Sequence, residues 1–190
     1  MISSQNGKII LINGASSAGK STLAAAVHKQ LNVPFIRFTF DQFIDSNAFP
    51  SAQIRAGAFS WQEMRPAIFD GYHRCWPALA GAGNNLLIDH IIEQKSWIVD
   101  LTQMLNDFDV FCVALHCSIE ELERREIARG DRGKGDARRD LEVVHKYTSY
   151  DLELNSEDAL DDNVQTLIKA WTERARPSAF EQMVAEFSSQ

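Results

Sequence analysis

One stretch of the sequence decides the fold: Gly14-Ala15-Ser16-Ser17-Ala18-Gly19-Lys20-Ser21. It matches the pattern G-x-x-x-x-G-K-[ST] at every fixed position. The apolar run 8–13 before it predicts a strand that is buried on both faces. From Lys20 onward, apolar residues recur at a spacing of four and predict a helix. A glycine-rich turn between such a strand and such a helix is typical of a phosphate-binding loop, because a turn that only caps a helix would not require lysine followed by serine.

The residue types of this loop suit the triphosphate of a nucleotide. Glycines let the backbone bend so that successive N–H groups face a phosphate, and the helix N-terminus adds the positive end of its dipole. The Lys20 ammonium would reach the β- and γ-phosphates, and the Ser21 hydroxyl would bind Mg²⁺. We therefore expect ATP and Mg²⁺ as cofactors, bound by Gly14, Ala15, Ser16, Ser17, Ala18, Gly19, Lys20, Ser21 and Thr22.

Short apolar runs alternate with helical patterns along the rest of the chain. We expect further strands at 35–40, 86–92, 110–115 and 152–154. This alternation predicts an α/β protein of the three-layer P-loop NTPase type, close to the nucleotide kinases, with a five-stranded, mostly parallel sheet between helices. A helix that begins after Ser60 is expected to kink or end at Pro66 and Pro77, and another short helix is expected at 141–147. Residues 1–190 are interpreted as one domain.

The charge balance excludes several classes of protein. The 190 residues contain 19 Lys and Arg against 26 Asp and Glu, a net charge of −7, so no broad surface for nucleic acid or for an anionic membrane is expected. Positive charge is nevertheless concentrated at 124–139, where seven basic residues outnumber three acidic ones. No apolar run approaches the roughly 20 residues of a membrane-spanning helix. Because the N-terminus does not look like a signal peptide and the three cysteines lack a C-x-x-C spacing, we predict a cytoplasmic protein with free thiols.

Two aspartates follow predicted strands. The phosphate loop and the carboxyl ends of parallel strands share one edge of a sheet, so both side chains would lie near the γ-phosphate. Asp41 would be the general base for an acceptor hydroxyl, or the N-cap of a helix that begins at Gln42, and the residues alone favour neither role. Asp89 ends an apolar strand as a Walker B carboxylate does; it would hold a magnesium-bound water or orient the acceptor, unless it is only a solvated carboxylate. A lone histidine such as His90 is more often structural or solvated than catalytic.

Three arginines point to a lid. Arg125, Arg129 and Arg132 are spaced so that a continuous helix would place them on one face. A glycine-rich loop at 130–136 predicts a mobile, arginine-rich lid over about 125–140. On such a lid the guanidinium groups would close on the γ-phosphate, and Arg129 and Arg132 are the better candidates because they flank the break. The alternative is a solvated, basic helix end that complements the helix dipole.

Together these segments resemble the chloramphenicol phosphotransferase family of small P-loop kinases, over most of the chain from 9 to about 171. The most specific part is R-E-I-A-R-G-D-R at 125–132 with Val-Val-His at 143–145 and Tyr-Asp at 150–151. The resemblance also rests on the phosphate loop, on Phe40-Asp41 and on Ile88-Asp89.

The resemblance implies an ATP-dependent kinase that phosphorylates a hydroxyl group of a small molecule. In the family the carboxylate that matches Asp41 is the base, the one that matches Asp89 assists at the acceptor, and the arginines that match Arg129 and Arg132 contact phosphates. Two departures concern the acceptor: the antibiotic kinase carries a second Asp at the position of His90, and the stretch between Asp41 and Trp61 is shorter here. We therefore expect the phosphotransfer reaction and do not expect the antibiotic itself as acceptor.

The resulting hypothesis is a Mg²⁺-dependent ATP kinase whose acceptor binds at about 41–80. The proposed catalytic residues are Asp41, Lys20, Arg129, Arg132 and Asp89, and Ser21 and Asp89 would hold the metal. A GTPase is disfavoured because the guanine-reading Asn-Lys-x-Asp is missing. The rivals are a toxin-like kinase of a nucleotide sugar, a kinase of nucleic-acid ends, and a non-enzymatic ATP-binding switch. A nucleic-acid acceptor is disfavoured because the fixed cations of 42–80 are only Arg55, Arg65 and Arg74.

Overall fold

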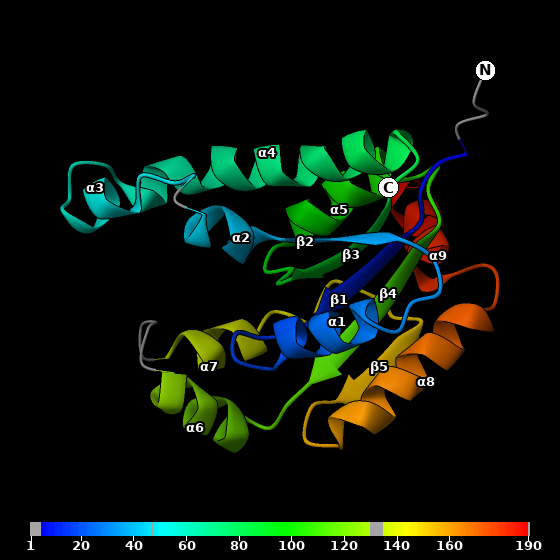
Figure 1. Cartoon of the computed structure of the whole chain (residues 1–190). Helices are drawn as coiled ribbons and strands as arrows, with labels where there is room; N and C mark the ends of the chain where they lie inside the picture. The colour runs from blue at the N-terminus through cyan, green and yellow to red at the C-terminus, as the bar shows by residue number, and fades with distance from the viewer. Residues whose placement is uncertain (1–4, 47, 130–134, 190) are drawn as a thin grey trace.

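The computed structural model describes residues 5–46, 48–129 and 135–189. Its sheet contains β1 (Ile9–Asn13), β2 (Phe35–Thr39), β3 (Asn85–His90), β4 (Val110–His116) and β5 (Leu152–Asn155). The strand order is β2-β3-β1-β4-β5, and every neighbouring pair is parallel (Figure 1). The predicted five-stranded sheet is therefore confirmed, and all five of its strands are parallel.

Helices cover both faces of this sheet (Figure 1). Alternate residues of a strand point to opposite faces. Ile9 and Leu11 of β1 pack with α4 (Trp61–Gly81), α5 (Lys95–Met104) and α9 (Ala179–Phe187), whereas Ile10 and Ile12 pack with α1 (Lys20–His28) and α8 (Leu160–Thr172). All five residues of β1 are buried, which explains its continuous apolar run. The helices are α1 (Lys20–His28), α2 (Phe40–Asp45), α3 (Ser51–Arg55), α4 (Trp61–Gly81), α5 (Lys95–Met104), α6 (Ile119–Arg129), α7 (Asp136–Leu141), α8 (Leu160–Thr172) and α9 (Ala179–Phe187).

The helix after Ser60 was expected to kink or end at its prolines, and it ends at neither of them. Helix α4 is one element of 21 residues that contains both Pro66 and Pro77. The Ser60 side chain caps it by accepting a hydrogen bond from the Glu63 amide at 3.3 Å. Each proline removes one backbone hydrogen bond. We attribute the continuity of the helix to packing, because its apolar side chains are buried against β1 and β3 on either side of Pro77.

The short helix expected at 141–147 is displaced in the structure. Helix α7 ends at Leu141, and turns follow it. The Glu126 carboxylate of α6 accepts hydrogen bonds from the Gly135 and Ala137 amides, both at 2.9 Å, and this fixes where α7 begins. Val144 is fully buried in a small cluster with Ala15 and Ala18 of the phosphate loop and with Ala137 of α7. Its apolar character therefore reflects that cluster and not a helical stripe.

None of the helices in the described ranges has the length and apolar character that crossing a membrane requires.

Candidate active site

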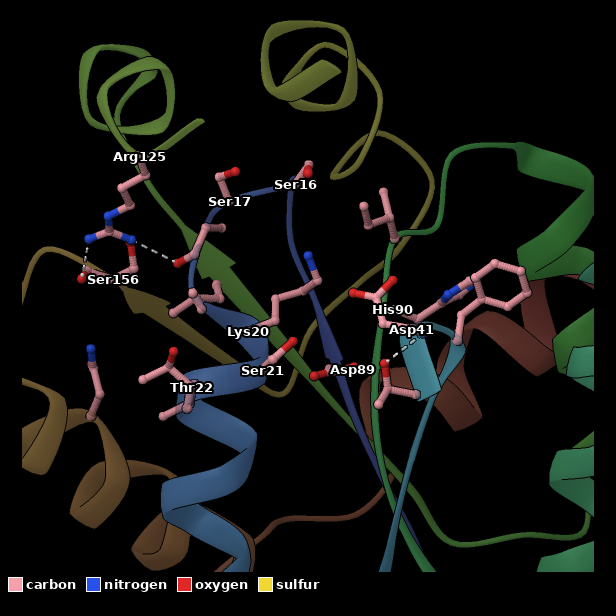
Figure 2. A pocket seen from close by; sticks show the side chains of 18 of the residues that line it. Ser16, Ser17, Lys20, Ser21, Thr22, Asp41, Asp89, His90, Arg125 and Ser156 are labelled. Carbon is pink, nitrogen blue, oxygen red and sulfur yellow. Dashed lines mark hydrogen bonds between the residues drawn. The ribbon is translucent and has the colours of Figure 1, made fainter. Parts of the chain in front are cut away.

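A cavity of about 740 Å³ runs along the carboxyl edge of the sheet (Figure 2). Its centre is the loop between β1 and α1, because β1 is the middle strand. One end of the cavity lies over β2 and β3, where Asp41, Asp89 and His90 line it. The other end lies over β4 and β5, where Leu115, Arg125, Ser156, Asp158, Leu160 and Asn163 line it. The arrangement follows from the strand order, since ligands of parallel sheets bind outside the carboxyl ends of the strands.

The phosphate loop needs glycine at both ends, for different reasons. A Cβ atom on Gly14 would lie 2.6 Å from the Leu115 carbonyl oxygen of β4, so only glycine fits there without movement. Gly19 has a φ of 94° and Ser17 a φ of 62°, so the chain turns through left-handed conformations before α1. Gly19 is the N-cap of α1 and has no side chain to cap it, which leaves the first amides of the helix to an anion.

Lys20 lies at the centre of the cavity and is directed towards the loop itself. Its ammonium donates a hydrogen bond to the Ala15 carbonyl oxygen at 2.7 Å. Ser21 and Thr22 line the same cavity from the first turn of α1 (Figure 2). The structure thus brings Lys20, Ser21, Asp41 and Asp89 to one cavity, although they come from three separate parts of the chain.

Asp89 has the geometry of a candidate magnesium ligand. It is 4% exposed, and its Oδ2 atom has no hydrogen-bond partner in the part of the chain that the structure describes. A buried carboxylate oxygen without a partner fits a hard cation. The described residues contain no cluster of three or more His, Cys, Asp or Glu side chains that would hold a metal. A single carboxylate beside a phosphate loop fits Mg²⁺, which binds through one or two protein groups together with water and substrate phosphates.

The interpretation of Asp41 as an N-cap is wrong. The N-cap of α2 is Thr39, whose hydroxyl accepts a hydrogen bond from the Asp41 amide at 3.3 Å, while Gln42 completes a capping box. Asp41 therefore lies in the first turn of the helix, where the dipole favours a carboxylate. It is half-buried and lines the cavity next to Phe40.

His90 has a partner that sequence reasoning missed. Its Nε2 atom lies 3.0 Å from Nε2 of His73 in α4, and both rings are buried. Burial lowers the pKa of His73 to about 4 and the pKa of His90 well below 6.5, so both rings are neutral at pH 7. His90 also stacks on Trp97, with ring centroids 5.7 Å apart. The signal for this pair was the spacing of Phe69, His73 and Trp76, which places His73 on the buried stripe of α4.

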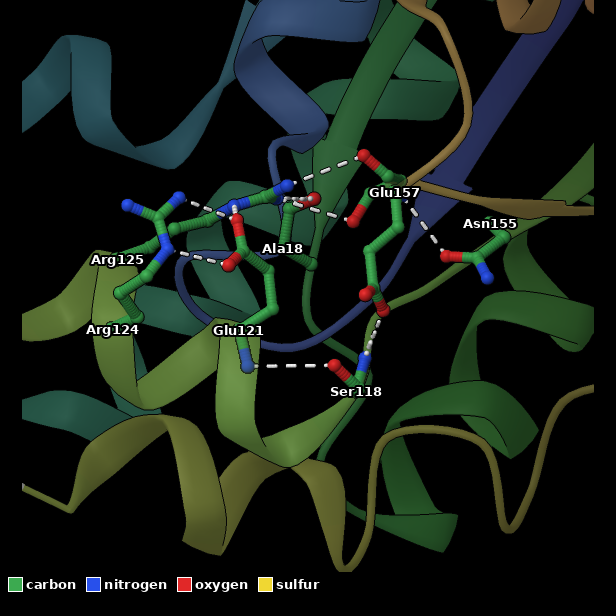
Figure 3. A network of polar contacts seen from close by, with 8 residues as sticks. Ala18, Ser118, Glu121, Arg124, Arg125, Asn155 and Glu157 are labelled. Atoms are coloured by element: carbon green, nitrogen blue, oxygen red, sulfur yellow. Dashed lines mark hydrogen bonds and ion pairs between the residues drawn. The ribbon is translucent and has the colours of Figure 1, made fainter.

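Of the three lid arginines, only the Arg125 side chain lies within the described residues. Arg129 is the last residue of α6, but its side chain lies outside the described part, as do Arg132 and the middle of the predicted lid at 130–134. Arg125 donates hydrogen bonds to the Ala18 carbonyl oxygen at 3.1 Å and to the Ser156 carbonyl oxygen at 3.2 Å (Figures 2 and 3). It also pairs with Glu121, and hydrogen bonds from Arg124 and Arg125 lower the pKa of that carboxylate to about 2. Arg125 therefore links α6 to the phosphate loop and to the turn after β5.

Comparison with known proteins places the chain in a family. The family described as "Chloramphenicol phosphotransferase-like protein" matches residues 7–173. The chain belongs to this family. Over 169 residues, the chain is 30% identical to a protein of Mycobacterium tuberculosis strain H37Rv that is named as a candidate O-phosphotransferase. The match covers 79% of this chain and 75% of the relative.

Solved structures show the same fold at low sequence identity. An APS kinase of Mycobacterium tuberculosis, in complex with AMPPNP and APS, is 19% identical with a TM-score of 0.62, and the match covers 88% of this chain and 99% of that one. Shikimate kinase from Bacteroides thetaiotaomicron is 22% identical with a TM-score of 0.59, and the match covers 87% of this chain and 98% of that one. The chain is thus a phosphotransferase with the P-loop kinase fold.

Proposed function

We propose that residues 1–190 form one kinase domain that transfers the γ-phosphate of ATP to a hydroxyl group of a small molecule. One observation carries the proposal: a single cavity holds the phosphate loop with Lys20 at its centre and the carboxylates Asp41 and Asp89 at one end. A carboxylate beside the place of a γ-phosphate is what acceptance of a hydroxyl proton requires. A protein that only binds a nucleotide and transfers no phosphate would not need a carboxylate at this place.

The two ends of the cavity suit two different ligands. We place the base of ATP over β4 and β5, where Arg125, Ser156 and Leu160 offer a cation, a hydroxyl and an apolar side chain. The acceptor then binds over β2 and β3, within the region 41–80 and the residues that follow β3. The complex of the related APS kinase fold with AMPPNP and APS, a nucleotide analogue and a second ligand, supports a cavity with room for two ligands.

In the proposed reaction the acceptor oxygen attacks the γ-phosphorus. A new O–P bond forms, the bond from the γ-phosphorus to the β,γ-bridging oxygen breaks, and ADP leaves with that electron pair. Asp41 takes the proton of the acceptor hydroxyl. Lys20 and the loop amides hold the phosphates, and Arg129 and Arg132 screen the charge of the γ-phosphate. Ser21 and Asp89, the latter through water, would hold Mg²⁺, which supplies charge neutralisation of the phosphates when bound.

The charge of the acceptor end favours an uncharged acceptor. Among the described residues, this end is lined by the carboxylates Asp41, Asp89 and Glu93, whereas Lys20 lies at the centre of the cavity and Arg125 at the other end. Arg65 does not line the cavity; it pairs with Glu93 at 2.6 Å, and its guanidinium lies over the Phe69 ring. An anionic acceptor would meet repulsion here, whereas an apolar or aromatic alcohol would pack on Phe40 and Phe69. The same argument disfavours the toxin-like kinase of a nucleotide sugar.

Use of ATP and three free cysteines support a cytoplasmic location.

The test is incubation of the protein with Mg²⁺ and γ-labelled ATP in the presence of a panel of acceptors. The panel contains uncharged alcohols, chloramphenicol among them, together with anionic sugars, nucleotide sugars and oligonucleotides. We expect label to move to an uncharged alcohol and ADP to form in equal amount. Label on a nucleotide sugar or an oligonucleotide would replace the proposal by the corresponding rival. Tight ATP binding without transfer to any compound would favour the non-enzymatic switch.

A further inference from the structure

A buried carboxylate touches the phosphate loop from the far end of α7. The Ser16 amide donates a hydrogen bond to Oδ2 of Asp140 at 3.1 Å, and 124 residues separate the two in the chain. Asp140 is 3% exposed and the Ser16 residue is also 3% exposed. No role in the reaction proposed above requires an acid at this place.

The segment that carries Asp140 is tied to its surroundings at three points. At its start, Glu126 of α6 accepts the Gly135 and Ala137 amides. At its end, the Val144 carbonyl oxygen accepts a hydrogen bond from the Asn13 side chain at 2.8 Å, directly before the phosphate loop. Between them lies the contact of Asp140 with Ser16. The acceptor of the Ser16 amide is therefore held in place by α6 and by the end of β1.

A negative charge at this place acts against the ligand of the loop. The N–H groups of a phosphate loop create a positive potential that attracts an anion. One of these groups, the Ser16 amide, already donates its hydrogen bond to the Asp140 carboxylate. Oδ1 of Asp140 pairs with the guanidinium of Arg139 at 3.4 Å, and the Arg139 side chain is exposed, so that water screens this pair. Burial raises the pKa of Asp140, against the effects of the Ser16 amide and of the charges on Arg139 and Lys20. Burying a carboxylate costs free energy that a neutral hydrogen-bond acceptor would not cost. A triphosphate bound at the same loop is repelled by the Asp140 carboxylate, because the protein interior between them screens charge poorly.

We propose that Asp140 is a positioning residue with two separable effects: its oxygen holds the Ser16 turn of the phosphate loop, and its charge weakens the binding of nucleotides in proportion to their phosphates. The proposal rests on nucleotide binding at the phosphate loop, as proposed above. The weaker binding would favour release of ADP after transfer, because affinity differences between related complexes lie mostly in dissociation rates.

The test compares three variants by titration calorimetry with ATP, ADP and adenosine in the presence of Mg²⁺. Asp140→Asn removes the charge and keeps an acceptor oxygen, and Asp140→Ala removes both. Glu142→Gln is the matched control, because Glu142 is exposed two residues further along the chain. We expect Asp140→Asn to bind ATP about tenfold and ADP about threefold more tightly than the natural protein, with adenosine unchanged. Asp140→Ala should bind ATP about fivefold more weakly than Asp140→Asn because Ser16 loses its acceptor, and Glu142→Gln should match the natural protein.

The outcomes separate the two proposals. If the natural protein binds no nucleotide, the proposed function fails, and the inference about Asp140 fails with it. If it binds ATP and Asp140→Asn binds ATP equally tightly or more weakly, the charge effect is refuted. Equal affinities of the Asn and Ala variants refute the positioning effect, and equal gains for ATP and adenosine show a general structural change instead. Should Asp140→Asn fail to fold, Asp140→Ala still removes the charge. The ratio of its ATP affinity to its ADP affinity must then be higher than the same ratio in the natural protein.

Discussion

At the scale of single residues, Asp41 carries the chemistry of the proposal. Its carboxylate lies in the first turn of α2 and lines the cavity, so it needs no large movement to meet an acceptor hydroxyl. We predict that Asp41→Asn keeps nucleotide affinity within about twofold and lowers kcat by about 10²–10⁴, because a carboxamide of the same shape cannot take a proton. The checks are nucleotide titration and initial rates with the acceptor that the panel identifies. Asp161→Asn, a change at an exposed position of α8, is the control. Full activity of Asp41→Asn would rule out the base assignment.

The histidine pair predicts a pH dependence of stability. Burial lowers the pKa of His73 to about 4, so the folded state prefers the neutral ring. The unfolded chain binds this proton from about pH 6.5 downward. The stabilisation is therefore present above pH 6.5 and is lost as the pH falls towards 4. We expect the free energy of unfolding to drop between pH 7.5 and pH 5 by about 2 kcal/mol more in the natural protein than in His73→Gln. Urea denaturation measures this, and equal drops would show that His73 is protonated equally in both states.

At the scale of elements, two glycines make a matched comparison. Gly14 approaches the Leu115 carbonyl oxygen, and a Cβ there would lie 2.6 Å from it; around Gly71 of α4 the space within 4 Å is open. We predict that Gly14→Ala lowers the free energy of unfolding by about 1–3 kcal/mol through strain between β1 and β4. Gly71→Ala should raise it by about 0.5–1 kcal/mol, because alanine loses less conformational freedom in a helix. Thermal denaturation of both variants checks the signs, and destabilisation by Gly71→Ala would contradict the assigned helix.

Local pattern predicted the strands well and two of the helices badly. The central strands β1 and β4 are almost entirely buried and largely apolar because helices cover both faces, and that pattern is visible in any window of five residues. The course of α4 through Pro66 and Pro77 depends on side chains that pack against β1 and β3. The start of α7 depends on Glu126, a residue of another helix. Such tertiary contacts override local propensity and are not readable from the residues of the helix itself.

At the scale of the whole molecule, strand order explains why the site residues meet. The carboxyl ends of β1, β2 and β3 lie side by side, so the phosphate loop, Asp41 and Asp89 gather although the sequence separates them. General rules for parallel sheets were enough to predict this. The contacts of His90 with His73 and of Asp140 with Ser16 join distant segments by single side chains. No periodicity encodes which side chains these are, and the structure was needed to find them.

The central claim is that one cavity binds the nucleotide at its β4–β5 end and the acceptor at its β2–β3 end. A crystal structure with Mg²⁺ and AMPPNP tests it most directly. We predict that the triphosphate lies along the loop from Ser16 to Ser21, with the base near Arg125 and Ser156 and the γ-phosphate directed towards Asp41 and Asp89. A base bound against Phe69 and His90, or a nucleotide bound away from the loop, would contradict the account.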